Sequence, residues 1–257
     1  MRSLSIYLFS FFVVAISVHA QPSAMARVKG GYYIPLYGMG KDQQVYVQDY
    51  YMDVTPVTNR QFYAFIKAHP EWSKSKVKRI FADANYLHTW ESDHSYPEKF
   101  ADSPVNFVSW FAADAYCKCY GKRLPTIDEW EYAAMAGEKT KDARKDSMYI
   151  KKILRWYETP KTQTLKVGQS PPNYWGIKDL FGLVWEWAYD FNAIILTGES
   201  RNNADTDKGL FCASGSIGAN DLMDYAAFMR YAFRSSLKAN YTINNLGFRC
   251  AKDINNK

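Results

Sequence analysis

The sequence lacks heptads, repeats of fixed period and low-complexity linkers. These absences favour one domain over a coiled coil, a solenoid or a string of modules. No basic stripe alternates with stacking aromatic residues, so we expect no nucleic-acid partner. The one stretch richer in lysine and arginine, residues 139–152, is interpreted as a solvated loop.

Aromatic residues are what the sequence has in excess. It contains 20 Tyr, 15 Phe and 8 Trp, which together make up 17% of its 257 residues. Hydrophobic residues at 47% and charged residues at 23% are ordinary for a globular protein, and the net charge of +6 is mild. The aromatic content predicts irregular structure held together by large rings rather than by long helices.

The N-terminus has the pattern of a signal peptide. Arg2 supplies positive charge, residues 4–18 are almost wholly apolar, and Val18 and Ala20 place small residues before a cleavage site. We therefore expect a signal peptide at residues 1–20, one domain at residues 21–257, and a periplasmic or secreted protein. An uncleaved anchor is the alternative; the apolar run is short for a membrane span, and we expect none after cleavage.

The chain has four cysteines: Cys117, Cys119, Cys212 and Cys250. An even number of cysteines in an exported protein favours disulfides, and four allow three pairings. Zinc is the competing interpretation for the first two. Their spacing is shorter than zinc sites use, and no histidine lies near them in the sequence.

Local patterns predict several elements in the first half of the chain. Two strands are expected at residues 27–37 and 45–52, the second as partner of the first. Helices are expected at residues 59–69 and 109–120.

A further helix should begin at Thr126, where Thr126 and Glu129 form a capping box, and end at Gly137. Residues 157–257 are predicted to form loops, short strands and turns.

Ordered sequence blocks resemble the formylglycine-generating enzyme (sulfatase-modifying factor) family. The blocks are YMDVTPVTN at 51–59, PVNFVSW at 104–110, DAYC at 114–117, GKRLPTIDEWEYAA at 121–134, GIKDLFGLVWEW at 176–187 and NLGFRC at 245–250. The resemblance implies an α+β fold, a variant of the C-type lectin fold with little regular secondary structure. Within these blocks we expect Trp130, Trp185 and Trp187 to serve packing.

The resemblance also implies a disulfide. In the family, the cysteine of the DAYC block bonds the cysteine of the terminal block, which corresponds here to Cys117 and Cys250. Cys119 and Cys212 match no family cysteine. They either pair with each other or remain free thiols.

The family's catalytic cysteines are missing. They form a thiolate pair that binds copper, and the resemblance, aligned on Arg234 and Ser235, places Asp221 and Ala226 at their positions. Neither side chain offers the sulfur that Cu(I) prefers, and Cys212 alone cannot replace a pair. We therefore expect no copper and no formylglycine-generating activity.

Other redox metals have few histidine ligands to use. After the signal peptide the chain keeps His69, His88 and His94, whereas related ergothioneine-synthesis enzymes use a histidine-rich iron site. Residues 88–94 gather possible ligands, yet they are interpreted as a solvated loop.

An oxidase of the pyoverdine-maturation type, which also dispenses with the cysteine pair, is an alternative. Its acidic candidates in this chain are Glu186, Asp190 and Asp221.

The resemblance implies one calcium site around the Trp-Glu-Trp motif. Carboxylate and carbonyl oxygens suit this hard cation, and a glycine allows a tight loop. Leu183 departs from the family's usual asparagine. The family's second site is not expected, because residues 138–157 are lysine-rich. The implied ligands are the side chains of Asp179 and Glu186 and the carbonyls of Gly182 and Val184.

These observations favour an exported, non-catalytic binding or scaffold protein. Its partner would be a periplasmic or cell-envelope protein or a small-molecule ligand. A periplasmic oxidoreductase is the alternative, and formylglycine generation ranks third.

Overall fold

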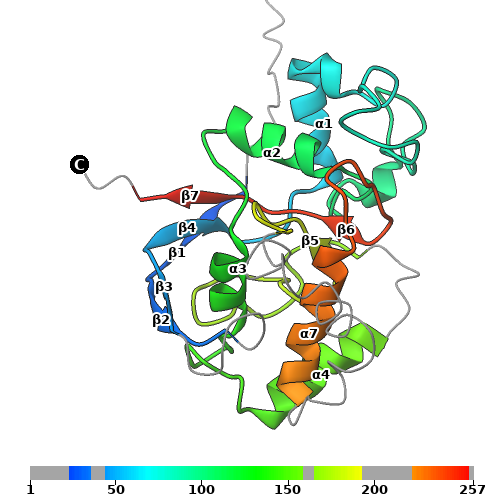
Figure 1. The fold of residues 1–257 in the computed structure, drawn as a ribbon. Helices are drawn as coiled ribbons and strands as arrows, with labels where there is room; N and C mark the ends of the chain where they lie inside the picture. The colour runs from blue at the N-terminus through cyan, green and yellow to red at the C-terminus, as the bar shows by residue number, and fades with distance from the viewer. Residues whose placement is uncertain (1–22, 36–43, 159–164, 193–221, 255–257) are drawn as a thin grey trace, which may run out of the picture.

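Short helices and small open sheets, joined by long irregular segments, make up the structure (Figure 1). The computed structural model describes residues 23–35, 44–158, 165–192 and 222–254. This mixture confirms the predicted α+β class. In chain order the elements are β1 (Met25–Val28), β2 (Gly31–Tyr33), β3 (Val45–Val47), β4 (Tyr50–Asp53), α1 (Asn59–Ala68), η1 (Pro70–Trp72), η2 (Glu98–Phe100), α2 (Trp110–Cys119), α3 (Ile127–Ala134), α4 (Ser147–Glu158), β5 (Trp185–Glu186), α7 (Leu222–Ser235), β6 (Leu246–Gly247) and β7 (Ala251–Asp253).

Strand β4 joins the beginning of the described chain to its end. It pairs antiparallel with β1 on one side and with β7 on the other, while β2 pairs with β3 in a separate ribbon. The predicted partnership of the first two extended segments is thus correct, but each segment is split into two strands. Part of the reason lies at Gly30, where an added Cβ would be 2.1 Å from the Val47 carbonyl oxygen. Only glycine permits the backbones to approach so closely.

The three helices predicted in the first half of the chain are present. Thr58 and Gln61 form a capping box at the start of α1, and Thr126 and Glu129 form one at the start of α3. In α2 the first residues are capped by the Ser109 hydroxyl. These side chains satisfy N–H groups that a helix leaves without internal partners. Helix α3 ends at Ala134, earlier than predicted.

The prediction of loops after α3 was wrong in two places. Residues 147–152 of the supposed solvated loop belong to α4, and α7 occupies residues 222–235 of the supposed loop region. In α4, Lys151 and Lys152 separate Ile150 from Ile153 in the sequence, but the helix buries Ile150, Ile153 and Trp156 on one face and leaves both lysines exposed. The two helices contact each other (Figure 1). Helix α7 escaped detection because its buried face carries arginines as well as apolar residues.

Large aromatic rings fill the core between α1 and α2, as the composition predicted. We call this the α1–α2 core; its rings include Phe62, Phe65, Tyr116, Trp187 and Phe248. Phe62 stacks on Tyr116 with 5.9 Å between ring centroids and meets Phe248 edge to face at 6.1 Å. Such pairs add stability beyond the area that they bury.

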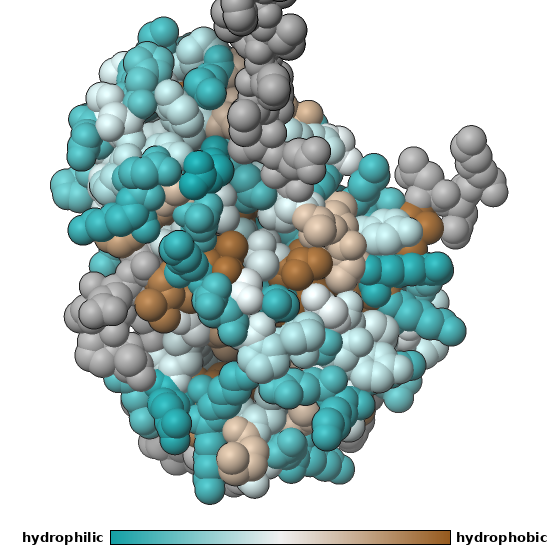
Figure 2. Space-filling view, turned by 180° about the vertical axis from the view of Figure 1, so that it is seen from behind, coloured by the Kyte–Doolittle hydropathy of each residue, from teal (hydrophilic) through white to brown (hydrophobic). Residues whose placement is uncertain are grey.

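Two further clusters complete the interior. One packs α3 against the β1–β4–β7 sheet, with Trp130 and Met52 among its residues. The other, the α4–α7 core, consists of Ile150, Ile153 and Ala226. On the face opposite to that of Figure 1, hydrophobic residues reach the surface in small separate patches among hydrophilic ones (Figure 2). Among the described helices, none has the length and apolar character needed to cross a bilayer.

Candidate functional site

Helix α7 carries one of the two positions that the resemblance assigns to catalytic cysteines. Ala226 is fully buried, and its methyl group packs against Ile150 and Ile153 of α4. Its carbonyl oxygen accepts a hydrogen bond from the Tyr157 hydroxyl at 3.2 Å. The position is therefore part of the joint between two helices. Asp221, the other position, and Cys212 lie outside the described residues.

Two arginines of α7 converge on one carboxylate of α3. Arg230 and Arg234 stand one helical turn apart, so their side chains emerge on the same face. Arg230 donates to Glu131 through Nε at 2.9 Å and Nη2 at 2.6 Å, and Arg234 donates through Nη1 at 2.8 Å. All three side chains are less than a tenth exposed. We call these residues the Glu131 cluster.

The charges of the Glu131 cluster do not cancel. Burial raises the pKa of Glu131, but the attraction of Arg230 and Arg234 outweighs burial and holds that pKa below its usual range. Two guanidinium groups then face one carboxylate. Arg230 also donates to the Tyr157 hydroxyl at 3.0 Å, and the Arg234 guanidinium lies 4.9 Å from the centre of the Trp130 ring. The Tyr157 oxygen and the face of the Trp130 ring thus stabilise the positive charge that Glu131 does not balance.

An aromatic stack ties α4, β5 and α7 together beside this cluster. Trp185 lies between Tyr157 and Phe233, with ring centroids 5.2 and 4.7 Å apart and planes tilted by 17° and 24°. Trp156 adds a tilted contact to Trp185 at 5.0 Å. The first tryptophan of the Trp-Glu-Trp motif thus serves packing, as predicted. Trp187 does so as well, because it is fully buried and donates to the Val108 carbonyl at 2.9 Å.

The carboxylate of the same motif is held by a buried ion pair. Glu186 accepts from Arg249 Nε and Nη2, both at 2.8 Å, and from Trp130 Nε1 at 2.8 Å. Neither Glu186 nor Arg249 exposes its side chain. As a calcium ligand, Glu186 would have to share oxygens that already accept three hydrogen bonds.

The other implied calcium ligands lie in the preceding loop. The Asp179 carboxylate accepts from the backbone N–H groups of Gly168, at 2.5 Å, and Ser170, at 3.2 Å. Gly182 has a φ of 116°, and Val184 is buried. No group of three or more His, Cys, Asp or Glu side chains in the described ranges is close enough to hold a metal ion. The calcium site stays a prediction.

The remaining acidic and histidine candidates do not come together. Asp190 accepts from the Ile127 N–H at 2.8 Å and so helps to cap α3; burial raises its pKa. Residues 88–94 lie between η1 and η2, where Asp93 accepts from the Ser75 N–H at 2.7 Å. Burial acts to raise the pKa of Asp93, but hydrogen bonds from the Ser75 backbone and hydroxyl lower it overall.

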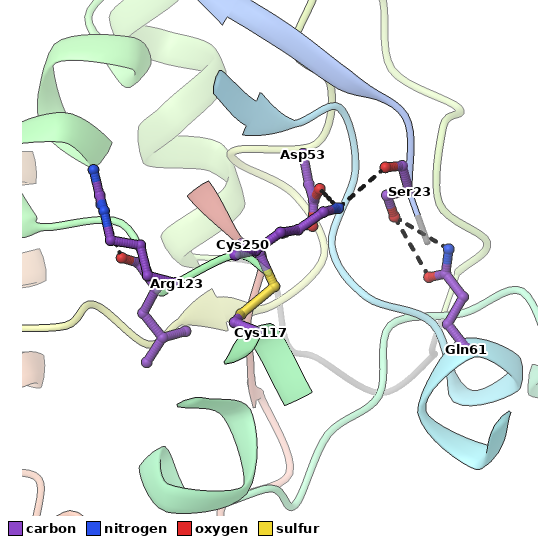
Figure 3. Close-up of a disulfide and its surroundings, with 8 residues drawn as sticks. Ser23, Asp53, Gln61, Cys117, Arg123 and Cys250 are labelled. Carbon is purple, nitrogen blue, oxygen red and sulfur yellow. Dashed lines mark hydrogen bonds and ion pairs between the residues drawn. A yellow bond between two sulfur atoms is a disulfide. The ribbon is translucent and has the colours of Figure 1, made fainter. Parts of the chain in front are cut away.

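The disulfide implied by the resemblance is present. Cys117 of α2 bonds Cys250, with an S–S distance of 2.12 Å (Figure 3). Beside it, the buried Asp53 carboxylate accepts from the Lys122 ammonium at 2.5 Å and from the Cys250 N–H at 3.0 Å. Cys119 is an exposed free thiol whose Sγ lies 3.1 Å from Nε2 of His69.

Sequence reasoning missed the Glu131 cluster. Glu131 lies inside a block that carries the resemblance, and Arg234 was used to align the chain with the family. The useful signal was the spacing of Arg230 and Arg234 on a helix. A spacing of four residues places two side chains on one face only in a helix, and α7 had not been predicted as a helix.

The comparisons with known proteins agree with this architecture. A family model described as the sulfatase-modifying factor enzyme 1-like domain matches residues 15–254. The formylglycine-generating enzyme of Bos taurus is 27% identical over 84% of this chain and 69% of its own length. The inactive C-alpha-formylglycine-generating enzyme 2 of Mus musculus is 26% identical over 91% of this chain and 87% of its own length.

Solved structures show the same fold. The crystal structure of CarF superposes with a TM-score of 0.51 at 17% identity, covering 91% of this chain and 99% of CarF. PvdO from Pseudomonas aeruginosa gives a TM-score of 0.50 at 16% identity, covering 90% of this chain and 94% of PvdO. At these identities the likeness shows the fold alone. Taken with the match that spans residues 15–254, it means that the chain belongs to the family of sulfatase-modifying factor enzyme 1-like domains.

Proposed function

We propose that this chain is an exported binding protein that uses the formylglycine-generating enzyme framework without its oxidase chemistry. One observation carries the proposal. Ala226, at a position that the resemblance gives to a catalytic cysteine, is a buried methyl group in the joint between α4 and α7. A buried methyl group can neither bind Cu(I) nor exchange with a substrate thiol.

A relative supports the same conclusion. The mouse protein that matches 91% of this chain is named an inactive formylglycine-generating enzyme. Loss of activity on an intact framework therefore has a precedent within the family. Export is supported by the N-terminal sequence pattern and by the disulfide, since disulfides persist in oxidising compartments.

An oxidoreductase of the pyoverdine-maturation type is the second candidate. The fold similarity to PvdO favours it only at the level of architecture. Two of its candidate acids, Glu186 and Asp190, already have structural partners. A redox enzyme of this kind would need another group to carry its chemistry.

Metal content and oxygen consumption separate the two candidates. Protein purified without chelators should contain no stoichiometric iron or copper. It should neither consume oxygen nor convert the cysteine of a sulfatase-derived peptide to formylglycine. The formylglycine-generating enzyme of Streptomyces coelicolor, a 30% identical relative, is the positive control. Stoichiometric redox metal together with turnover would overturn the proposal.

Calcium is part of the proposal as a structural ion held by Asp179, Gly182, Val184 and Glu186. An ion that binds only the folded state stabilises it by about 2.7 kcal/mol at one hundred times its dissociation constant. Thermal unfolding with calcium and with a chelator measures this effect. Asp179→Asn should abolish the calcium-dependent shift, because it removes the charge that binds the cation; it keeps one of the two oxygens that accept from the loop. An equal shift in the variant would place the ion elsewhere.

A further inference from the structure

The C-terminal ends of α1 and α2 bring a thiol and an imidazole together. His69 follows the last residue of α1, and its backbone N–H donates to the Phe65 carbonyl at 2.8 Å. Cys119 is the last residue of α2, and the two helices contact each other. The Cys119 Sγ lies 3.1 Å from His69 Nε2, which is close enough for a proton to pass between them.

The imidazole of His69 is held on two sides. Its ring packs on the buried Phe65 ring, with centroids 5.1 Å apart and planes tilted by 34°. Its Nδ1 faces Glu71 Oε1 at 3.5 Å. A carboxylate on this side favours the tautomer that carries its proton on Nδ1, so that Nε2 can accept the proton of the thiol. The three side chains thus form a nucleophile, a base and an acid that orients the base.

The surroundings of this group favour a cation at His69 over an anion at an isolated thiol. His69 and Cys119 both lie at helix C-termini, where the last carbonyl groups carry partial negative charge. Lys118, beside Cys119 in α2, already binds the Asp114 carboxylate at 2.7 Å. Among the described residues, His69 is therefore the group in contact with the sulfur that can take its proton.

The thiol is open to small reagents. Cys119 is exposed and forms no disulfide among the described residues, whereas Cys117, two positions earlier on α2, is fully buried in its bond to Cys250. An oxidising compartment favours the disulfide form of small thiols. A thiol that gives its proton to a neighbouring base attacks such disulfides, since the thiolate is the reacting species.

We propose that Cys119 is a site of thiol–disulfide exchange, where a small disulfide leaves one of its halves on the protein and His69 transfers the proton. The Cys119 sulfur forms a bond to one sulfur of the small disulfide RS–SR, and the bond between the two sulfurs of RS–SR breaks. The thiol proton moves to His69 Nε2 and then to the departing RS⁻.

This exchange needs no other oxidant. Cys119 is oxidised to a mixed disulfide, and one half of the small disulfide is reduced to RSH. The modification lies outside the α4–α7 joint and does not depend on the proposed binding function.

Reaction with bis(hydroxyethyl) disulfide, an uncharged probe, tests the proposal. The unreduced protein is incubated with the probe at about pH 7, where an isolated thiol is mostly protonated. Peptide mass spectrometry then follows the mixed disulfide at Cys119 over time. The folded protein should react at Cys119 about tenfold or more faster than the same chain unfolded in urea. Equal rates, or no mixed disulfide at Cys119, would overturn the proposal.

A matched pair of histidine variants identifies the base. His69→Gln should slow the reaction of the folded protein about tenfold or more, because it removes the proton acceptor, and should leave the rate of the unfolded chain unchanged. His94→Gln, at an exposed histidine far from Cys119 in the sequence, should change the folded rate by less than about twofold. Urea denaturation establishes that both variants are folded in the assay. A folded His69→Gln that reacts as fast as the wild type would overturn the proposal.

Glu71→Gln tests the orienting charge. At low ionic strength it should slow the reaction about two- to fivefold, as expected for an exposed ion pair. At about 1 M salt the difference from the wild type should largely disappear, because salt screens such a pair, whereas a purely structural effect would remain. A difference that remains would overturn the role of Glu71. The assays of metal content and oxygen consumption are independent of these rates, so failure here leaves the non-catalytic proposal standing.

Discussion

The region around the α1–α2 core and the region around α7 are held together by different interactions. In the first, aromatic rings and the Cys117–Cys250 disulfide join elements that are far apart in sequence. In the second, a carboxylate and two arginines are buried together, and a three-ring stack lies beside them. The first region keeps the framework that the resemblance implies. In the second, the position that the resemblance assigns to a catalytic cysteine lies in the contact between α4 and α7.

Removing the disulfide should have the largest effect in this comparison. It links residues 133 positions apart, and closing a loop of that length stabilises the fold by about 5 kcal/mol in the chain-entropy model. We expect the double variant Cys117→Ser, Cys250→Ser to lose about that much unfolding free energy, measured by urea denaturation. Cys119→Ser, at the exposed thiol of the same helix, is the matched control and should change stability by less than about 0.5 kcal/mol.

Breaking the Glu131 cluster should be nearly as costly. Glu131→Gln leaves two buried guanidinium groups without a counter-charge, and removing one partner of a buried ion pair costs about 3 to 5 kcal/mol. The control is Glu98→Gln in the exposed Arg60–Glu98 pair, where the loss should not exceed about 1 kcal/mol. If the two variants lost similar stability, α7 would not depend on its buried charges.

Acid should weaken the α7 region through the same carboxylate. The pKa of Glu131 is lower in the folded protein, so the unfolded chain binds more protons. Stability from this group is fully present above the unfolded pKa of about 4.3 and is lost as the pH falls through the lower, folded pKa. The fall in unfolding free energy below that pH should be shallower in Glu131→Gln. An unchanged slope would assign the acid sensitivity to other carboxylates.

The sequence predicted the first region far better than the second. The Thr126–Glu129 capping box predicted the start of α3 by side-chain chemistry that acts within three residues, and the structure caps α1 and α2 in the same way with Thr58 and Ser109. The Glu131 cluster has no such local signal. Glu131 and Arg230 are 99 residues apart, and their contact exists only after α3 and α7 have packed. Local patterns therefore predicted three helices, and the family resemblance implied the fold class, but neither predicted α7 or its charges.

Removing the N-terminal cap of α3 should lower the unfolding free energy by less than either change above. Thr126→Ala removes the hydroxyl that accepts from the Glu129 N–H at 3.1 Å, and loss of such a cap costs about 1 kcal/mol. Thr126→Ser keeps the acceptor and should recover most of the unfolding free energy. Since α3 also carries Glu131, a loss much larger than a cap explains would show that the cap positions the cluster as well.

Modification of Cys119 should have the smallest effect on stability, and its reaction with a thiol reagent is easily detected. Its thiol is exposed and lies 3.1 Å from Nε2 of His69, whereas Cys117 and Cys250 are buried in their disulfide. A maleimide should therefore label Cys119 in the folded, unreduced protein, and peptide mass spectrometry should find neither disulfide cysteine labelled. If Cys119 reacts only after reduction, it is paired with Cys212, the alternative that the sequence leaves open. If Cys119 reacts freely, it forms no second disulfide. The Cys117–Cys250 bond then stabilises the α1–α2 core, and α7 is held by its buried ion pairs instead.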